Sequence, residues 1–599
     1  MVAINLFHEP SFSDKLSNIG SLVQICALLA ALVGYASRFY PLEVSQATHC
    51  ELQGVDGIYP TPEHFIGMAL KLIDAALAEC GDEAPPICVV QALIIATHCH
   101  LTRGVHGRAW RSLGLCVRLA YELNLHLVDA QGVTKSGRED PIQWRDDEEK
   151  RRAWWAIWEM DVFASTIRRT PPAIAWAQME TLLPVDDADW FKDRVAPSAF
   201  MESDAVQRWK SLRDTGNQSP KAWFLVINSL MKDAQVISCP RGVYLKPNSE
   251  QRQAQSGPTR IKARDRNSRN VEEACQRLEM LANAVQCFVL ALPTHLRYRN
   301  QYLGFDPPVA GQDGSSLRQL HCGIYNIFVM TQLARLMIHR YAIFGGYHTH
   351  DRQPAVPSHL VQDDVSGQTS SGCQDPDNPA VMSYFEAADN ILMIVNRSCE
   401  EHIQHINPFL PSTIWLAAAV QLVRKYIGRP SVRPELIKSR FDVLYLTYKR
   451  CVTFWDAKTA MEQNLEALEM QLEGHYNSEH SSRGRTSCEK SKELPERVTS
   501  NDYQFWAPDE PTNQNPLRVD ARQEQMSSIA ADRGQSQMLA QQDSIPAVSV
   551  AEAVISPALF DGSAAVNPMA ADGIHQDLEW RSLDLPLDIQ DLLSGFSTY

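Results

Sequence analysis

The side chains best suited to chemistry occur in two clusters that combine histidine with cysteine or glutamate. The first contains residue types that bind zinc: His98, Cys99, His100 and His106. Side chains two positions apart on a helix point in different directions, so this spacing favours packing over a metal site. The second has the residue types of a metalloprotease helix without their H-E-x-x-H order, and we expect no metal there either: Glu400, Glu401, His402 and His405.

A run of acids is the remaining candidate for catalysis. In an all-helical enzyme such as a terpene cyclase, acidic side chains bind magnesium, and Asp146, Asp147 and Glu149 are of that type. They open a predicted helix, however, where the helix dipole alone favours carboxylates. The sequence contains no second magnesium motif, phosphate-binding glycine loop or nucleophile elbow. We therefore expect no catalytic residues and no enzyme.

The composition indicates a folded protein from a reducing compartment. The 599 residues are 44% apolar, which is enough to bury one large core or two ordinary ones. The net charge of −15 opposes binding of a polyanion by the whole surface, because phosphate contacts need clustered Lys and Arg. The 14 cysteines are scattered singly, as expected for reduced thiols rather than a disulfide scaffold.

The elements that must position these side chains are all predicted to be helices. Apolar residues recur at helical spacing from about residue 20 to 470, and no convincing series of strands is present in the sequence, so the fold class is all-α. Two breaks rich in Gly, Ser, Gln and Pro are expected to be surface loops, Pro240–Arg269 and Asp351–Asn378. The predicted helices are Ser21–Ser37, Pro62–Ala78, Pro86–Thr102, His106–Leu125, Asp146–Ile167, Glu272–Leu290, Ser316–Phe344, Ala380–Cys399, Pro411–Ile427 and Ile437–Leu472.

One stretch, Ser21–Tyr40, is the candidate for a membrane segment. Gln24 interrupts it, no basic cluster precedes it, and its apolar run is shorter than the roughly 20 residues that a bilayer requires. A buried core helix is favoured over a membrane anchor.

Two helices in the first third of the chain carry the strongest pattern. The first has one apolar stripe, made of Ala109, Leu113, Cys116, Ala120 and Leu123. Gly107 and Gly114 lie seven residues apart, and we expect a neighbouring helix to approach closely there. The second is predicted to pair Glu148 with Arg152 at i,i+4 and to bury a broad face with Trp154, Ile157, Trp158 and Val162.

The order of these motifs resembles the middle homology domain of fungal zinc-cluster transcription factors. The resemblance runs from FHEPSF through GRAWRSLGLCVRLAYELNLH, EEKRRAWWAIWEMD, RRTPPAI and LLPVDDADW to ALPTHLR and NPFLPSTIWLAAAVQLVRKY, over residues 5 to 470. Arg169-Thr170-Pro171 stands where such domains commonly carry Gly-Arg-Pro. The residues that match the signature are Gly107, Trp110, Gly114, Arg118, Leu119, Ala120, Leu125, His126, Glu149, Arg151, Arg152, Trp154, Trp155, Asp161 and Pro171.

The resemblance implies a large helical regulatory domain of a nuclear transcription regulator. The family's DNA-binding module holds two zinc ions with six cysteines, whereas this sequence contains no C-x-x-C pair and FHEPSF lies close to Met1. Either the gene model is truncated or this is a relative without the cluster. We accordingly expect no cofactor in this chain, zinc only in a missing upstream cluster, and contact with DNA only through such a cluster or one that a partner supplies.

The segments outside the helical body suggest its other contacts. The domain is expected over residues 1–472, followed by a disordered linker at 473–570 that is poor in large apolar residues, and by an acidic amphipathic activation segment at 571–599. In that segment the spacing of Ile589, Leu592, Leu593 and Phe596 fits a short helix that binds a coactivator groove, or alternatively one that docks on the chain's own body. A basic run is either a solvated loop or a nuclear import signal, and consists of Arg260, Lys262, Arg264, Arg266 and Arg269.

The predicted function is therefore regulation of transcription. Family membership favours an activator of a pathway-specific gene set, with a secondary-metabolite cluster ranked slightly ahead of nutrient use. The alternative is a modulator without a zinc cluster that pairs with a full-length factor and does not itself bind DNA. Partners are expected to be coactivators and a second subunit, in a homodimer or heterodimer, with no membrane.

Overall fold

Helices and the loops between them make up the described part of this computed structural model: residues 4–39, 61–130, 140–238, 260–307, 317–344, 378–427, 433–457 and 464–474. Within these ranges there is no strand, and the single extended pairing is an isolated bridge between Leu303 and Ser398. The all-α fold class is confirmed.

An N-terminal group of helices precedes the central helix. It consists of α1 (Phe12–Ser17), α2 (Leu22–Ala36), α4 (Pro62–Cys80), α5 (Ile87–Arg103) and α6 (Gly107–Glu122). The side chain of Thr61 caps α4 by accepting from the backbone N–H of His64, and Pro62 fits the first turn because it needs no donor there. Gly34 lets α2 approach α4 closely, since a Cβ at that position would lie 2.7 Å from Cδ1 of Ile66.

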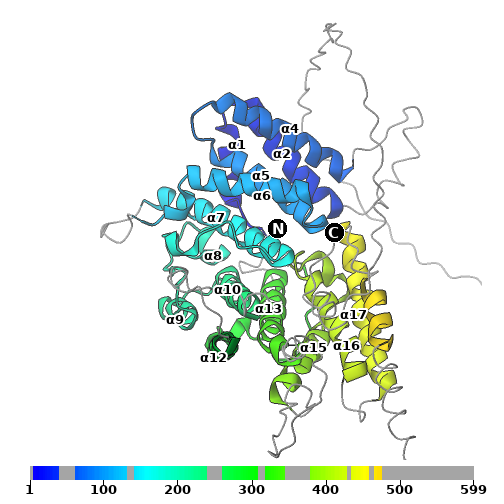
Figure 1. The fold of residues 1–599 in the computed structure, drawn as a ribbon. Helices are drawn as coiled ribbons and strands as arrows, with labels where there is room; N and C mark the ends of the chain where they lie inside the picture. Colours follow the sequence, from blue (N-terminus) through cyan, green and yellow to red (C-terminus); the bar gives the residue numbers. More distant parts are fainter. Residues whose placement is uncertain are drawn as a thin grey trace, which may run out of the picture. The chain divides into compact units, whose positions relative to one another are not determined.

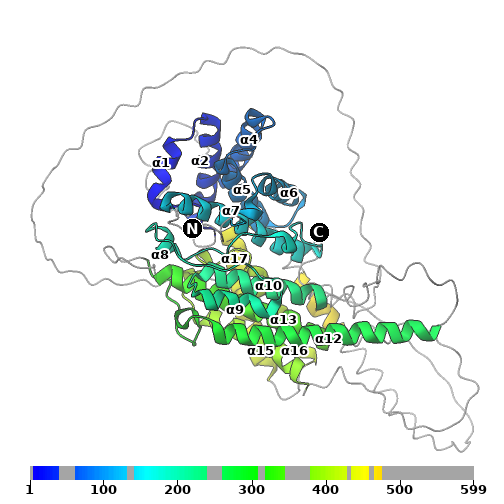
Figure 2. The same cartoon turned by 90° about the vertical axis from the view of Figure 1, so that its left-hand side faces the viewer.

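The central helix α7 (Pro141–Arg168) lies between the N-terminal group and the helices that come after it in the chain (Figures 1 and 2). It packs against α5 and α6 on one side and against α10 on the other. Asp140 caps its first turn by accepting from the N–H of Ile142, and the helix ends at Arg169, which adopts a left-handed conformation with φ 53°.

The remaining helices form a C-terminal group. They are α8 (Asp187–Trp190), α9 (Ala205–Thr215), α10 (Pro220–Ser238), α12 (Arg260–Ala291), α13 (Leu317–Phe344), α15 (Pro379–Asn396), α16 (Pro411–Ile427) and α17 (Pro434–Trp455), followed by helical residues 464–474. Gly323 of α13 permits close contact with α10, because a Cβ there would lie 2.6 Å from Cβ of Pro220. Buried apolar side chains from Ile4 to Leu472 form one contiguous core through both groups.

Two helices begin well before the residues predicted for them. The helix α7 begins at Pro141 rather than Asp146, so the acids at 146–149 lie inside it and not at its N-terminus. The helix α12 begins at Arg260, so the predicted loop at Pro240–Arg269 was wrong for its last ten residues. Arg, Lys and Ala there are good helix formers, and an existing helix extends without a new nucleus. Figure 2 shows α12 extending beyond its neighbours.

Further differences concern α17 and the helices that were not predicted, which include α8, α9 and α10. The long helix predicted from Ile437 to Leu472 is interrupted, because α17 ends at Asp456 in a left-handed conformation and helical residues resume only at 464. The helix α10 was not predicted. Most of its residues are buried, and it packs against α13, α12 and α7. The second predicted loop lies outside the described residues, apart from Asn378, which caps α15.

The apolar stretch at the N-terminus forms α2. Residues Leu22–Phe39 are long and apolar enough to cross a membrane by length and composition. One face of α2 is buried against α4 and α5 through residues such as Ala27 and Ala31, whereas Leu22 and Val33 are exposed. The prediction of a buried core helix is therefore correct only for the face of α2 that packs against α4 and α5.

Candidate functional site

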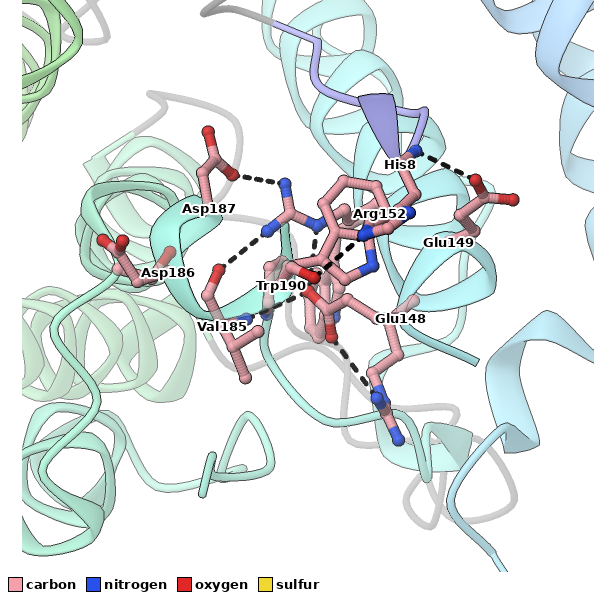
Figure 3. Close-up of polar contacts among 12 residues, drawn as sticks. His8, Glu148, Glu149, Arg152, Val185, Asp186, Asp187 and Trp190 are labelled. Carbon is pink, nitrogen blue, oxygen red and sulfur yellow. Dashed lines mark hydrogen bonds and ion pairs between the residues drawn. The ribbon is translucent and has the colours of Figure 1, made fainter. Parts of the chain in front are cut away.

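The signature residues of α7 form a buried polar network with three segments outside the helix, and Figure 3 shows the contacts to His8 and to residues 185–190. Glu148, Arg151 and Arg152 are all buried, and Glu148 is fully enclosed. Glu148 accepts from Arg152 Nε at 2.9 Å and from Arg151 Nη1 at 3.3 Å. The predicted i,i+4 pair is confirmed. Because a buried carboxylate is costly without partners, these contacts offset the burial of Glu148.

Arg151 connects α7 to the segment after α6. Its guanidinium donates to both carboxylate oxygens of Asp129, with Nε–Oδ2 at 3.0 Å and Nη2–Oδ1 at 2.6 Å. Asp129 also accepts from the N–H of Leu182 at 2.8 Å. Burial lowers the pKa of Arg151, but the bond to Asp129 and the charge of Glu148 outweigh it and the pKa is raised. Arg151 is therefore a permanent cation that joins two loops to the helix.

Arg152 connects α7 to the LLPVDDADW segment. It donates to Asp187 Oδ1 at 2.6 Å and to the carbonyl of Val185 at 2.8 Å, while the N–H of Val185 donates to Glu148 at 3.0 Å. The guanidinium carbon lies 4.0 Å from the ring centroid of Trp190, as in a cation–π contact. Arg152 thus has both charged and aromatic partners around its buried guanidinium.

Glu149 connects the N-terminal FHEPSF segment to the same helix. It accepts from the backbone N–H of His8 at 3.0 Å and pairs with Lys15 at 2.9 Å. The imidazole of His8 bridges Ser11 Oγ at 2.8 Å and the carbonyl of Trp190 at 3.0 Å. Burial lowers the pKa of His8, although the charge of Asp193 opposes this effect. His8 thus joins the first residues of the domain to residue 190.

A second buried carboxylate on α7 reaches the C-terminal group. Glu159 pairs with Lys221 of α10 and accepts from Asn407 Nδ2 at 2.5 Å. The backbone N–H of Asn407 donates to the side chain of Asn326 on α13 at 3.1 Å. The central helix therefore carries polar connections in both directions.

The aromatic positions of the signature are core residues. Trp154, Trp155 and Trp158 are fully enclosed. Trp155 donates to the carbonyl of Leu182 at 2.7 Å, and the rings of Trp158 and Trp176 pack with centroids 5.1 Å apart. Among the described residues the indole nitrogens of Trp154 and Trp158 have no partner, so their role is packing.

The positions on α6 divide into a buried and an exposed face. The predicted stripe is buried, with Leu123 only half-buried, and Leu119, Ala120 and Leu125 are enclosed. Trp110 lies under the guanidinium of Arg168 at 5.1 Å, and His126 packs on Tyr121 at 4.9 Å.

The expected close approach at Gly107 and Gly114 was wrong. Both glycines are exposed, as is Arg118, and no neighbouring helix lies within 4 Å of a Cβ built at either glycine. Small residues favour close packing only on the face that the amphipathic stripe turns inward. Here the apolar stripe faces the core, and the two glycines lie on the opposite, solvent-exposed side of α6.

The turn after α7 positions the last signature residues. Asp161 accepts from the backbone N–H of Ile174 at 3.0 Å, and burial raises the pKa of its carboxyl. Pro171 is exposed in the same turn. Arg169 has a φ of 53°, a left-handed conformation that favours glycine.

The clusters considered for metal binding are packing or turn residues. His98 lies between Phe409 and Tyr35, with ring centroids 4.8 and 5.8 Å away, and burial lowers its pKa well below the usual value. His402 belongs to the short helix Glu400–Gln404 and contacts the carbonyl of Cys399 at 2.6 Å. No group of three or more potential ligands is found in the described ranges.

Two predicted contact regions fall wholly or partly outside the described residues. The coactivator residues Ile589, Leu592, Leu593 and Phe596 lie beyond residue 474. The basic run from Arg260 to Arg269 is described only as backbone, in the first turns of α12.

The network partners that sequence reasoning missed are His8, Asp129, Asp187 and Trp190. His8 and Trp190 belong to motifs that carry the resemblance, so a signal existed. Their partners could not be inferred, because Glu149 contacts His8 across 141 residues and His8 contacts Trp190 across 182.

Taken together, the charged groups of this network are matched to one another and hold segments of the chain on α7. Such an arrangement suits a structural scaffold for a regulatory domain. Residues 2–236 match the family model of the fungal specific transcription factor domain, so the chain contains this domain. That family consists of transcription factors rather than enzymes, which implies a role in the nucleus.

Several characterised fungal proteins are similar to part of the chain. They include the tropolone cluster transcription factor tropK of Talaromyces stipitatus, 29% identical over 139 residues, or 23% of this chain and 24% of that protein. The ascochitine biosynthesis cluster transcriptional regulator of Didymella fabae is 27% identical over 165 residues, or 28% of each chain. The Zn(2)-C6 fungal-type transcription factor FTF1c of Fusarium oxysporum f. sp. lycopersici is 26% identical over 201 residues, or 33% of this chain and 20% of the relative. The matches thus span about a quarter of these relatives, and no solved structure matches.

Proposed function

We propose that this chain is the regulatory part of a nuclear activator of a secondary-metabolite gene cluster. The observation that carries the proposal is the family match over residues 2–236, together with relatives named for the tropolone and ascochitine clusters. Control of nutrient-use genes is the next function in rank, because it is the other common role in the family.

The route to DNA is the second part of the proposal. With a net charge of −15 and no C-x-x-C pair in its 599 residues, the chain is proposed to reach DNA through a zinc cluster that a longer form or a partner subunit supplies. Coactivators would bind the segment at Ile589–Phe596. Import would use the basic run in the first turns of α12.

Deletion of the gene in the host fungus tests the proposed function. Transcripts of one contiguous set of biosynthetic genes should fall, and reintroduction of the gene should restore them. If transcripts of nutrient-use genes fall instead, the second-ranked function is correct. If no transcript changes under conditions that express the gene, the chain is not an activator.

A binding titration at physiological salt separates the two routes to DNA. The purified 599-residue chain should show no sequence-specific binding to promoter DNA, and addition of a full-length zinc-cluster partner should confer it. Nanomolar, sequence-specific binding by the chain alone would contradict this part of the proposal.

A further inference from the structure

A cavity of about 260 Å³ lies in the C-terminal group, at the face of α13. Its walls are the end of α12, the loop after that helix, and two positions of α15, whose helix packs against α13. The lining apolar side chains are Val289, Leu292, Leu296, Ile327, Phe328 and Met393. The cavity lies apart from the network on α7 and shares none of its residues.

The size and walls of the cavity suit a small apolar molecule. An engineered apolar cavity of about 150 Å³ binds benzene, so by the same scaling 260 Å³ accommodates about ten non-hydrogen atoms. The rings of Tyr298 and Phe328 pack with centroids 4.7 Å apart and form an aromatic part of the wall. Burial of an apolar ligand against these side chains would be favourable.

Two polar groups in the lining have unused hydrogen-bonding capacity. The hydroxyl oxygen of Tyr298 is buried and has no partner among the described residues. Arg335 of α13 is half-buried, and its hydrogen bond to the side-chain oxygen of Gln286 is long, with Nη2 3.5 Å away. Burial lowers the pKa of Arg335, although the charge of Glu386 opposes this effect. An anion in the cavity would supply the missing partner.

The charge of the lining favours an anion over a cation. Arg297, Arg299 and Arg335 line the cavity, and no carboxylate does so among the described residues. This positive lining is a local exception in a chain with a net charge of −15. The amides of Gln332 and Asn390 bond to each other at 3.3 Å and add a neutral polar edge.

We propose that this cavity binds a small organic carboxylate of about ten non-hydrogen atoms in total, most of them in an apolar body. The guanidinium of Arg335 pairs with the carboxylate, the hydroxyl of Tyr298 donates to it, and the apolar body lies against Phe328. A guanidinium presents a fork of donors that matches the geometry of a carboxylate. Binding at this site does not depend on the proposed role in transcription, so the two can be tested separately.

Isothermal titration of the full chain with paired probes tests the proposal. Phenylacetate and octanoate should each bind saturably with one site per chain, and their amides at least about tenfold more weakly, since a charge-assisted hydrogen bond contributes about that factor. Acetate should also bind at least about tenfold more weakly than phenylacetate, because it lacks the apolar body.

Two variants assign the binding to this cavity. Arg335→Gln should weaken phenylacetate binding at least about tenfold and leave phenylacetamide nearly unchanged, because only the charged probe uses the guanidinium. Tyr298→Phe should weaken the acid several-fold without lowering thermal stability, since it removes a hydroxyl that has no partner in the described chain. Arg111→Gln, on the exposed face of α6, is the matched control and should change nothing.

The outcomes are decisive in either direction. If neither carboxylate binds, or if both bind as well as their amides, the proposal is wrong. If Arg335→Gln binds phenylacetate like the wild type while its circular dichroism melt shows an intact fold, the ligand lies elsewhere. Should Arg335→Gln fail to fold, the response of Tyr298→Phe to the acid decides, because that change retains the packing of the ring.

Discussion

Removal of Glu148 should reveal how much the network on α7 stabilises the domain. In Glu148→Ala the buried N–H of Val185 loses its acceptor, which was at 3.0 Å, and Arg151 and Arg152 each lose one partner. Both arginines retain Asp129 or Asp187, so neither charge is left alone. The loss of two charge-assisted hydrogen bonds and of the acceptor of a buried N–H costs about 3–5 kcal/mol in sum, and we expect a loss of unfolding free energy in this range.

The expected change in melting temperature depends on the size of the domain. An unfolding entropy of about 2.1 cal/mol/K per residue over roughly 370 described residues gives about 0.8 kcal/mol/K. A loss of about 3–5 kcal/mol then lowers the melting temperature by about 4–6 °C. Circular dichroism at 222 nm, with urea unfolding as a second probe, measures both quantities.

Two comparisons make the result specific to the buried network. Glu148→Gln should cost less than Glu148→Ala, because its remaining oxygen can still accept from Val185 and Arg152. Glu469→Ala removes an exposed ion pair to Lys425, and should cost less than about 1 kcal/mol. A Glu148→Ala protein that melts within about 1 °C of the wild type would refute the reasoning, as would a glutamine variant less stable than the alanine one.

Three further changes test other parts of the structure. Trp158→Ala, at a fully enclosed indole, should cost about 3–5 kcal/mol in unfolding free energy, and an unchanged melt would mean that the residue does not belong to the core. Burial lowers the pKa of His402 to about 4, so the folded state resists protonation and stability should fall as the pH drops from about 6.5 to 4. His402→Asn, measured by urea unfolding across that range, should remove up to about 3 kcal/mol of this dependence, whereas an unchanged pH profile would contradict the assignment. Leu592→Ala with Leu593→Ala should silence a reporter driven by the last 25 or so residues fused to an unrelated DNA-binding domain, and equal activity of the variant would favour the docking-helix alternative.

Local patterns in the sequence were sufficient for most helices and for the core face of α7. Trp154, Ile157 and Trp158 recur at helical spacing, and all three are enclosed in the structure. The pair Glu148–Arg152 was predictable for the same reason, since residues four apart on a helix are neighbours. Features set by the period of a single helix can be inferred without knowledge of the rest of the fold.

Long-range pairing could not be predicted in this way. Nothing in the local sequence around Glu149 shows that it accepts from His8, or that Asp129 receives Arg151, because these contacts depend on how separate segments meet. The wrong expectation of a close helix approach at the glycines of α6 has the same cause. Gly107 and Gly114 have no Cβ, so a second helix could pack closely against their side of α6. Only the tertiary structure determines whether a helix lies there.

This distinction explains why the family is easier to recognise than the pathway. The signature residues hold the segments around His8, Asp129 and Val185 on α7, and all of these lie within residues 2–236, which match the family model. The lining of the proposed carboxylate site lies at residues 289–335 and 390–393, beyond the stretch 2–236 that matches the family model. Side chains such as Arg335 and Tyr298 can therefore differ among relatives without loss of the scaffold. If different relatives respond to different small molecules, the sequence differences between them should concentrate among the residues that line this cavity. Exchange of the lining residues between two relatives should then exchange their ligands and leave both folds intact.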